Sequence, residues 1–192
     1  MHDNVRRMAA GEWRELRGIA LEALRDSPSA FSLSYAECAA RPDDYWQHRA
    51  AREATARECA TFAAIVPAAS APGDAAGGEA GDEAGDETGR WVGITAVEPL
   101  PDVPDTVHIH SVYVAPAYRG SAGPAAALVR AAVRHAREHT DVGALTLGVH
   151  EDNERAQAFY RRLGFEPTGK VVPYVRRPQD RILVLGYPDF RA

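Results

Sequence analysis

The chain has 192 residues, 45% of them hydrophobic, which suits a single domain with a sizeable core over residues 1–192. Six acidic residues lie between positions 67 and 89, and without them the formal net charge of -5 becomes +1, so nothing indicates a surface for nucleic acid. Two cysteines without paired spacing exclude a disulfide framework and a zinc site, and no apolar stretch resembles a signal peptide or a membrane span. We therefore expect a cytoplasmic protein that works without a metal, a nucleic acid or a membrane.

Two helices are predicted in the first third of the chain. The first covers residues 12–27, where apolar residues recur at helical spacing: Trp13, Leu16, Ile19, Ala20 and Leu24. The second is expected around residues 35–52, with an interruption near Pro42. The apolar run CATFAAIV at residues 59–66 then predicts a strand.

Residues 67–89 form a low-complexity segment rich in Ala, Gly, Asp and Glu. Such a composition cannot bury enough apolar surface to offset the entropy of ordering it. Because strand-like runs flank the segment at 59–66 and 90–98, we interpret it as a long loop inserted into a hairpin. It is either a tolerated insertion without function or an acidic loop that binds a partner.

The remaining elements alternate between strand and helix patterns. Strands are predicted at 90–98, 106–115 and 144–149, helices at 124–138 and 153–164, and two final strands within 169–188. The complete order is β-αα-βββ-α-β-α-ββ, which indicates a mixed α/β fold built on one central sheet.

The stretch VYVAPAYRGSAGPAAALV, residues 112–129, joins a strand to a helix through a turn of small residues. The first backbone N–H groups of a helix have no internal partner, and the helix dipole adds partial positive charge there, so this junction predicts an anion site. Arg119 adds a fixed charge, and a pyrophosphate is the expected guest. A plain tight turn is the alternative. Neither a Walker-type loop nor a dinucleotide-binding G-x-G-x-x-G fingerprint is present.

A second motif follows one strand later, in NERAQAFYRRLGF at residues 153–165. Together with the loop after Arg119 it resembles the GCN5-related N-acetyltransferase (GNAT) family, which pairs an Arg/Gln-x-x-Gly-x-Gly/Ala loop with an N-x-x-A-x-x-F-Y-x-x-x-G-F helix. The positions that match this helix are Asn153, Ala156, Phe159, Tyr160, Gly164 and Phe165. The resemblance covers residues 90–165, and the N-terminal helix pair more loosely.

The resemblance implies a fold and an activity. The fold is a central mixed, mostly antiparallel sheet with a V-shaped splay between two strands, flanked by about four helices. The activity is transfer of an acetyl group from acetyl-CoA to a primary amine, with no metal. A small-molecule amine is the expected acceptor, and a homodimer is one expectation because relatives often dimerise. The alternatives are a protein N-terminus or lysine as acceptor, a non-catalytic acyl-CoA-binding module, or an interaction protein that works through the acidic segment.

The resemblance also implies which residues hold acetyl-CoA. Backbone groups of Val112, Tyr113 and Val114 would pair with the pantetheine arm. The loop departs from the family pattern, because the expected glycine is Ala122; either Ala122 replaces it, or the loop carries one extra residue. The loop residues expected at the pyrophosphate are Arg119, Gly120, Ser121, Ala122, Gly123 and Ala125.

Tyr160 is the predicted general acid, since a phenol is protonated at neutral pH and can donate to the departing thiolate. An aromatic residue packed in the core is the alternative. Tyr160 follows Asn153 by two helical turns, so both are expected to face the cofactor, although Asn153 also suits a helix N-cap.

The predicted base is His108 or His110 in TVHIHSVYV, with His150 a weaker candidate and a water chain another route. Strand alternation places both histidines on one face, together with Val112 and Val114. They are otherwise two ordinary sheet histidines. Three aromatic residues are expected either to line an acceptor pocket or to pack in the core: Phe31, Trp46 and Tyr174.

Overall fold

The computed structural model describes residues 4–67, 89–188 and 190–191. Seven strands form one sheet in the order β1-β2-β3-β4-β5-β7-β6. The strands are β1 (Asn4–Arg7), β2 (Ala60–Val66), β3 (Arg90–Pro99), β4 (Thr106–Val114), β5 (Ala144–His150), β6 (Glu166–Tyr174) and β7 (Arg177–Gly186). Only β4 and β5 run parallel and the other pairs are antiparallel, so the mixed, mostly antiparallel sheet is confirmed.

The helices are α1 (Trp13–Asp26), α2 (Tyr35–Ala39), α3 (Asp43–Thr55), α4 (Ala125–His139) and α5 (Glu154–Arg162), with short 3-10 turns η1 (Pro28–Ala30) and η3 (Pro116–Tyr118). The helix predicted around 35–52 is two helices, because Pro42 ends the first and caps the second. This separation gives five α-helices where about four were expected. The other predicted helices and strands lie within a few residues of their expected bounds.

Helices cover both faces of the sheet. The core on one face joins the sheet to α4 and α5 through fully buried side chains such as Leu128, Val129 and Phe165. The core on the other face joins it to α1, α2 and α3 through Leu16, Ile19 and Trp46. The apolar residues along one side of α4 are all buried in the first core: Leu128, Val129, Ala132, Val133 and Ala136.

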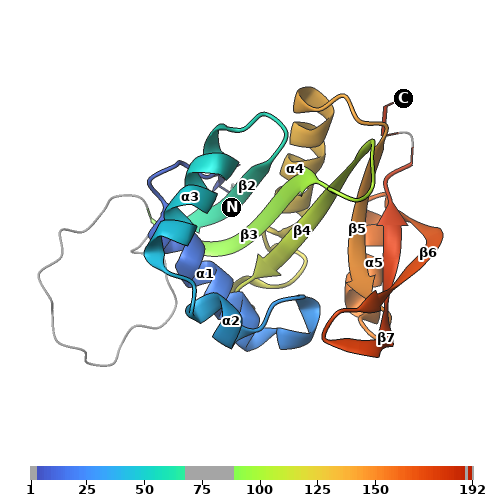
Figure 1. The fold of residues 1–192 in the computed structure, drawn as a ribbon, viewed down its shortest axis with the longest axis horizontal. Helices are drawn as coiled ribbons and strands as arrows, with labels where there is room; N and C mark the ends of the chain where they lie inside the picture. Colours follow the sequence, from blue (N-terminus) through green and yellow to red (C-terminus); the bar gives the residue numbers. More distant parts are fainter. Residues whose placement is uncertain (1–3, 68–88, 189, 192) are drawn as a thin grey trace, which may run out of the picture.

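The splay between β4 and β5 positions the site. Their pairing starts at Thr106 with Ala144 and ends at Ile109 with Leu147, although both strands continue beyond these residues. Figure 1 shows the two strands side by side at the top of the view and separating towards the bottom. Beyond Ile109, the edge of β4 that faces β5 therefore carries backbone groups that no strand of the described chain pairs.

A bulge in β4 corrects one prediction. Between the pairs Ile94–Tyr113 and Ala96–His110, β4 holds one residue more than β3, and Ser111 there has φ +54°. The extra residue shifts the alternation by one position. Val112 and Val114 consequently pack towards α4, in the core that also holds Ile109.

The two histidines lie on the opposite face. His110 pairs with Glu98, which also contacts Arg52 of α3, so these side chains lie on the face that α3 covers. The prediction that His108 and His110 share a face is confirmed, and the prediction that Val112 and Val114 share that face is wrong.

The predicted acidic loop, residues 67–89, lies outside the described residues except for its first and last positions. Among the helices of the described residues, none has the length and apolar character needed to cross a membrane.

Candidate active site

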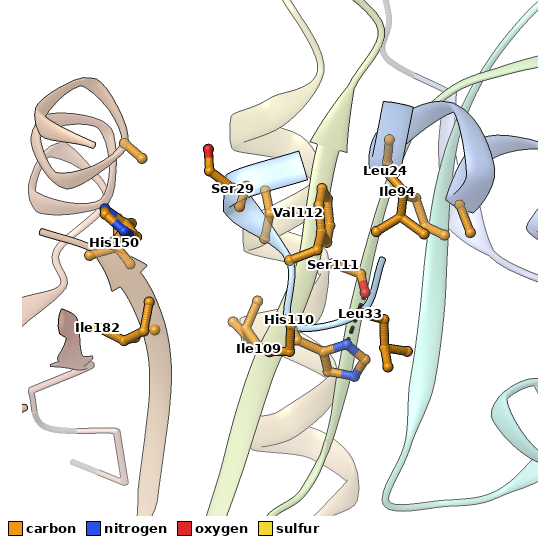
Figure 2. Close-up of a pocket in the computed structure, with 18 of the residues that line it drawn as sticks. Leu24, Ser29, Leu33, Ile94, Ile109, His110, Ser111, Val112, His150 and Ile182 are labelled. Carbon is orange, nitrogen blue, oxygen red and sulfur yellow. Dashed lines mark hydrogen bonds between the residues drawn. The ribbon is translucent and has the colours of Figure 1, made fainter. Parts of the chain in front are cut away.

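A cavity of about 370 Å³ opens where β4 and β5 diverge. Figure 2 shows Ile109, His110, Ser111 and Val112 of β4 on one side of it, with His150 and Ile182 across the gap. Residues of η1, α1 and α3 complete its wall. The cavity lies beside the unpaired edge of β4, which is where an extended ligand can add hydrogen bonds to the sheet.

The cavity gathers many of the residues predicted from the sequence. Its lining includes His108, His110, Val112, His150, Asn153 and Tyr160, together with Phe31, Trp46 and Tyr174. Tyr113, Val114 and the loop of residues 119–125 are not among the lining residues. The loop instead lies between η3 and α4, beyond the C-terminal end of β4.

Tyr160 lies on α5 with 8% of its surface exposed. Its ring packs against Phe159 and Phe165, with centroids 5.2 and 6.0 Å away. Both predicted environments are therefore present, since the ring belongs to the core and the residue lines the cavity. Burial raises the pKa of the Tyr160 phenol above its ordinary value, so the group keeps its proton at neutral pH.

His110 lies between a carboxylate and a hydroxyl. Its Nε2 is 3.2 Å from Oε1 of Glu98, and its Nδ1 is 3.0 Å from Oγ of Ser111 (Figure 2 shows the second contact). The pKa of Glu98 is lowered to about 2, first by the hydrogen bond from His110, so this carboxylate is ionised and only accepts. Nε2 of a neutral His110 must then carry the proton, and Nδ1 accepts from the Ser111 hydroxyl.

His108 has a different environment on the same face. Its Nδ1 lies 2.9 Å from the hydroxyl of Thr146 on β5. Burial, followed by the charge of His110, lowers the pKa of His108 to about 4. His108 is consequently neutral at physiological pH.

His150 and Asn153 hold local structure at the other wall. The backbone N–H of Asp152 donates to Nδ1 of His150, so Nε2 carries the proton and donates to Asp180, 3.2 Å away. The side chain of Asn153 accepts from the N–H of Ala156 at 3.0 Å and caps α5, as one of the two predictions has it.

The loop after η3 presents backbone donors before α4. The N–H groups of Gly120, Ser121 and Ala122 have no hydrogen-bond partner among the described residues. Gly123 donates to the carbonyl of Gly120, and a Cβ at Gly123 would lie 2.3 Å from the carbonyl oxygen of Tyr118. The close approach explains why residue 123 is a glycine, whereas Ala122 is accommodated.

Arg119 is held by the protein on two sides. Its Nε donates to the carbonyl of Val114 at 2.8 Å, and its Nη2 pairs with the carboxylate of Asp26 at the end of α1. The guanidinium also lies over the ring of Tyr113, 5.6 Å from its centroid. Arg119 thus joins the loop to α1 and β4 and is fixed in place beside the free donors.

Three residues of this region were missed from the sequence. Glu98 is 12 positions before His110 and meets it only through the hairpin register, which the pairing of β3 with β4 sets. Ser111 enters the site because of the bulge, for which the sequence holds no signal that we recognise. Arg49, a residue of α3, lines the cavity beside Trp46.

Comparison with known proteins agrees with this arrangement. The family model described as "Acetyltransferase (GNAT) family" matches residues 80–165, which include β3, β4, the loop, α4, β5 and α5. Residues 80–165 carry a GNAT acetyltransferase domain. No curated protein matches the sequence. The predicted resemblance to GNAT acetyltransferases is confirmed, and so is the acyltransferase domain that it implies.

Solved structures share the fold at low sequence identity. A GNAT-family acetyltransferase from Streptococcus pneumoniae is 14% identical, with 95% of this chain and 96% of that chain covered and a TM-score of 0.70. The YncA acetyltransferase of Salmonella typhimurium with acetyl-CoA is 16% identical over 97% and 93%, with a TM-score of 0.68. Spermidine N-acetyltransferase from Vibrio cholerae with CoA and spermine is 13% identical over 98% of both chains, with a TM-score of 0.66.

Proposed function

We propose that this GNAT acetyltransferase transfers an acetyl group from acetyl-CoA to the primary amine of a small molecule, by direct attack of the amine in a ternary complex. One observation carries the proposal: the cavity at the β4–β5 splay holds both a protonated phenol, Tyr160, and a histidine aligned by a carboxylate, His110. An acid and a base that line the same cavity can act on one reacting centre.

The described residues fit acetyl-CoA. The unpaired edge of β4 at Val112, Tyr113 and Val114 offers backbone groups to a pantetheine arm. The free N–H groups of residues 120–122, with the dipole of the 15-residue α4, suit a pyrophosphate. Of the two loop alignments, the close approach at Gly123 favours the one with an extra residue, in which Gly123 and Ala125 take the family's small positions.

Tyr160 and Asn153 have separate tasks at the cavity. When bound, acetyl-CoA supplies the thioester carbonyl carbon, at which a C–N bond forms and a C–S bond breaks. Tyr160 donates its proton to the leaving sulfur and takes a proton back from solvent, which its raised pKa favours. Asn153, which caps α5 at the cavity wall, would orient the cofactor or a bridging water.

The proton of the substrate's ammonium group leaves through Ser111 and His110. The hydroxyl of Ser111 accepts from the amine and donates to Nδ1 of His110, while Glu98 stabilises the imidazolium through Nε2. His108 is the weaker base, because a group whose pKa is about 4 holds a proton poorly at pH 7. Its hydrogen bond to Thr146 suits a role in holding the wall of the cavity.

The other predicted functions remain alternatives to acetylation of a small amine. A cavity of about 370 Å³ favours a small amine over a protein N-terminus or lysine, and the aligned acid and base favour catalysis over a binding module. A role through the acidic segment, a homodimer and a cytoplasmic location stay predictions.

Thiol release from acetyl-CoA across a panel of amines tests the proposal, with Tyr160→Phe as the variant. Phe retains the ring packing, so we expect unchanged binding of acetyl-CoA in calorimetry and a kcat about 10²–10⁴-fold lower, the range for general acid–base catalysis. Binding without turnover by the wild type would favour the non-catalytic module. Equal turnover by wild type and variant would remove Tyr160 from the mechanism.

A further inference from the structure

The side chains that line the cavity carry charge of one sign only. Among the described lining residues there is no Asp, Glu or Lys, and Arg49 is the one group with a permanent charge. We propose that the acceptor is an amino acid with an apolar side chain, whose carboxylate binds at Arg49 and whose amine faces Ser111. This inference rests on the proposed function and names its substrate class.

Within the described chain, only Nε of the Arg49 guanidinium makes a hydrogen bond. Its Nε donates to Oε1 of Glu53 at 2.8 Å, one turn further along α3. Glu53 is only 3% exposed and is also held by Arg52 and the hydroxyl of Thr61. Within the described chain the hydrogen bonds of Arg49 use Nε alone, so both terminal nitrogens remain for the two oxygens of a carboxylate.

Trp46 adds a second donor at the same wall. Trp46 lines the cavity, is fully buried, and its indole N–H has no hydrogen-bond acceptor among the described residues. The guanidinium carbon of Arg49 lies 5.8 Å from the centre of this ring. A buried donor without an acceptor is costly, and a ligand oxygen at this wall would offset that cost.

The rest of this wall is apolar. Leu24 of α1, Phe31 after η1 and Ile94 of β3 also line the cavity. Their surface suits an aliphatic or aromatic side chain. A polyamine does not suit it, because a second ammonium would lie in a cavity with no lining carboxylate and with a guanidinium already present. The proposed substrate thus differs from the polyamine named for the Vibrio cholerae structure.

Matched acceptors test this inference with the wild-type protein. Leucine, leucinamide and 3-methylbutylamine share the side chain and amine and differ in the carboxylate, and methionine and phenylalanine give parallel sets. We expect kcat/KM to be about 10- to 100-fold higher for each acid than for its amide, the range for hydrogen bonds to a charged group. The amide has the more readily deprotonated amine, so this preference cannot come from amine reactivity. Spermidine should be a poor acceptor.

Variants of Arg49 show where the carboxylate binds. Arg49→Gln should raise KM for leucine by the same factor and change kcat/KM for 3-methylbutylamine much less, while Arg49→Lys should recover part of the loss. Arg17→Gln is the matched control, because it also removes an arginine that pairs with α3, at Asp43, and does not line the cavity. Thermal unfolding of all three variants checks that the fold is retained, including where Glu53 loses its contact with Arg49.

The outcomes separate the inference from the proposed function. Equal rates for acids and amides, or a preference for spermidine, would overturn the carboxylate site while the acetyltransferase activity stands. If no amine reacts, calorimetry of leucine with the CoA-loaded protein decides: binding that Arg49→Gln abolishes supports the site without the activity, and no binding overturns it.

Discussion

The imidazole of His110 lies 3.2 Å from the carboxylate of Glu98, a residue on the neighbouring strand. The same ring lies 3.0 Å from the hydroxyl of Ser111, at the bulge of β4. A carboxylate, an imidazole and a hydroxyl therefore form a chain that ends at the cavity. Such a chain fixes the histidine tautomer and directs its accepting nitrogen to the hydroxyl.

Replacing Glu98 tests this chain. Glu98→Gln keeps the shape of the side chain but removes the charge that stabilises protonated His110, so we expect kcat to fall about 10-fold or more with the KM for acetyl-CoA unchanged. Glu151→Gln, which removes a carboxylate paired with Arg181 outside the cavity, is the control. An unchanged kcat in Glu98→Gln would remove the carboxylate from the mechanism.

The half-buried His108 predicts a pH dependence of stability. Its pKa of about 4 lies below the ordinary value of about 6.5, so the unfolded chain binds more protons between these two values. Its contribution is therefore complete above about pH 6.5 and is lost as the pH falls towards 4. We expect the free energy of unfolding of His108→Gln, from urea titrations, to depend less on pH in this window than that of the wild type. His135, whose pKa is also about 4, retains its own contribution in both proteins.

A methyl group at Gly123 should weaken cofactor binding. The Cβ of Gly123→Ala would lie 2.3 Å from the carbonyl oxygen of Tyr118, so the loop must move and its free N–H groups with it. We expect the Kd for CoA, measured by calorimetry, to rise about 10-fold or more. Ser121→Ala is the control, since it changes only a side chain and keeps the backbone N–H. Equal affinity in both variants would place the pyrophosphate elsewhere.

Tyr174, at the end of β6, connects the β6–β7 hairpin to the segment of Pro28 and Phe31. Its hydroxyl donates to the carbonyl of Phe31 at 2.9 Å and lies 3.3 Å from that of Pro28. Tyr174→Phe should lower the free energy of unfolding by about 0.5–1.5 kcal/mol, the usual net contribution of one hydrogen bond. Because Phe31 and Tyr174 both line the cavity, the KM for the amine should rise more than kcat falls. Tyr187→Phe, outside the cavity, should leave this KM unchanged, and a larger effect there would contradict the assignment.

Much of the site could be predicted because it is encoded locally. Asn153 and Tyr160 lie two turns apart on one helix, so their common direction follows from helical geometry. The loop at residues 119–125 could be recognised because small residues between a strand and a helix start leave backbone donors exposed. The pairing of His110 with Glu98 could not be predicted, because it depends on which residues face each other across β3 and β4.

The sequence by itself determined the order of helices and strands, the resemblance to the GNAT family and the two motifs that carry it, because periodicity and turn residues act over a few positions. Only the tertiary structure decided the faces of β4, where one extra residue at Ser111 turns Val112 and Val114 away from the histidines. It also decided that Arg49 lines the cavity and that none of the described lining residues is an Asp or a Glu. These features arise from register and packing between distant segments, and a change of one residue in register reverses the face of every side chain that follows.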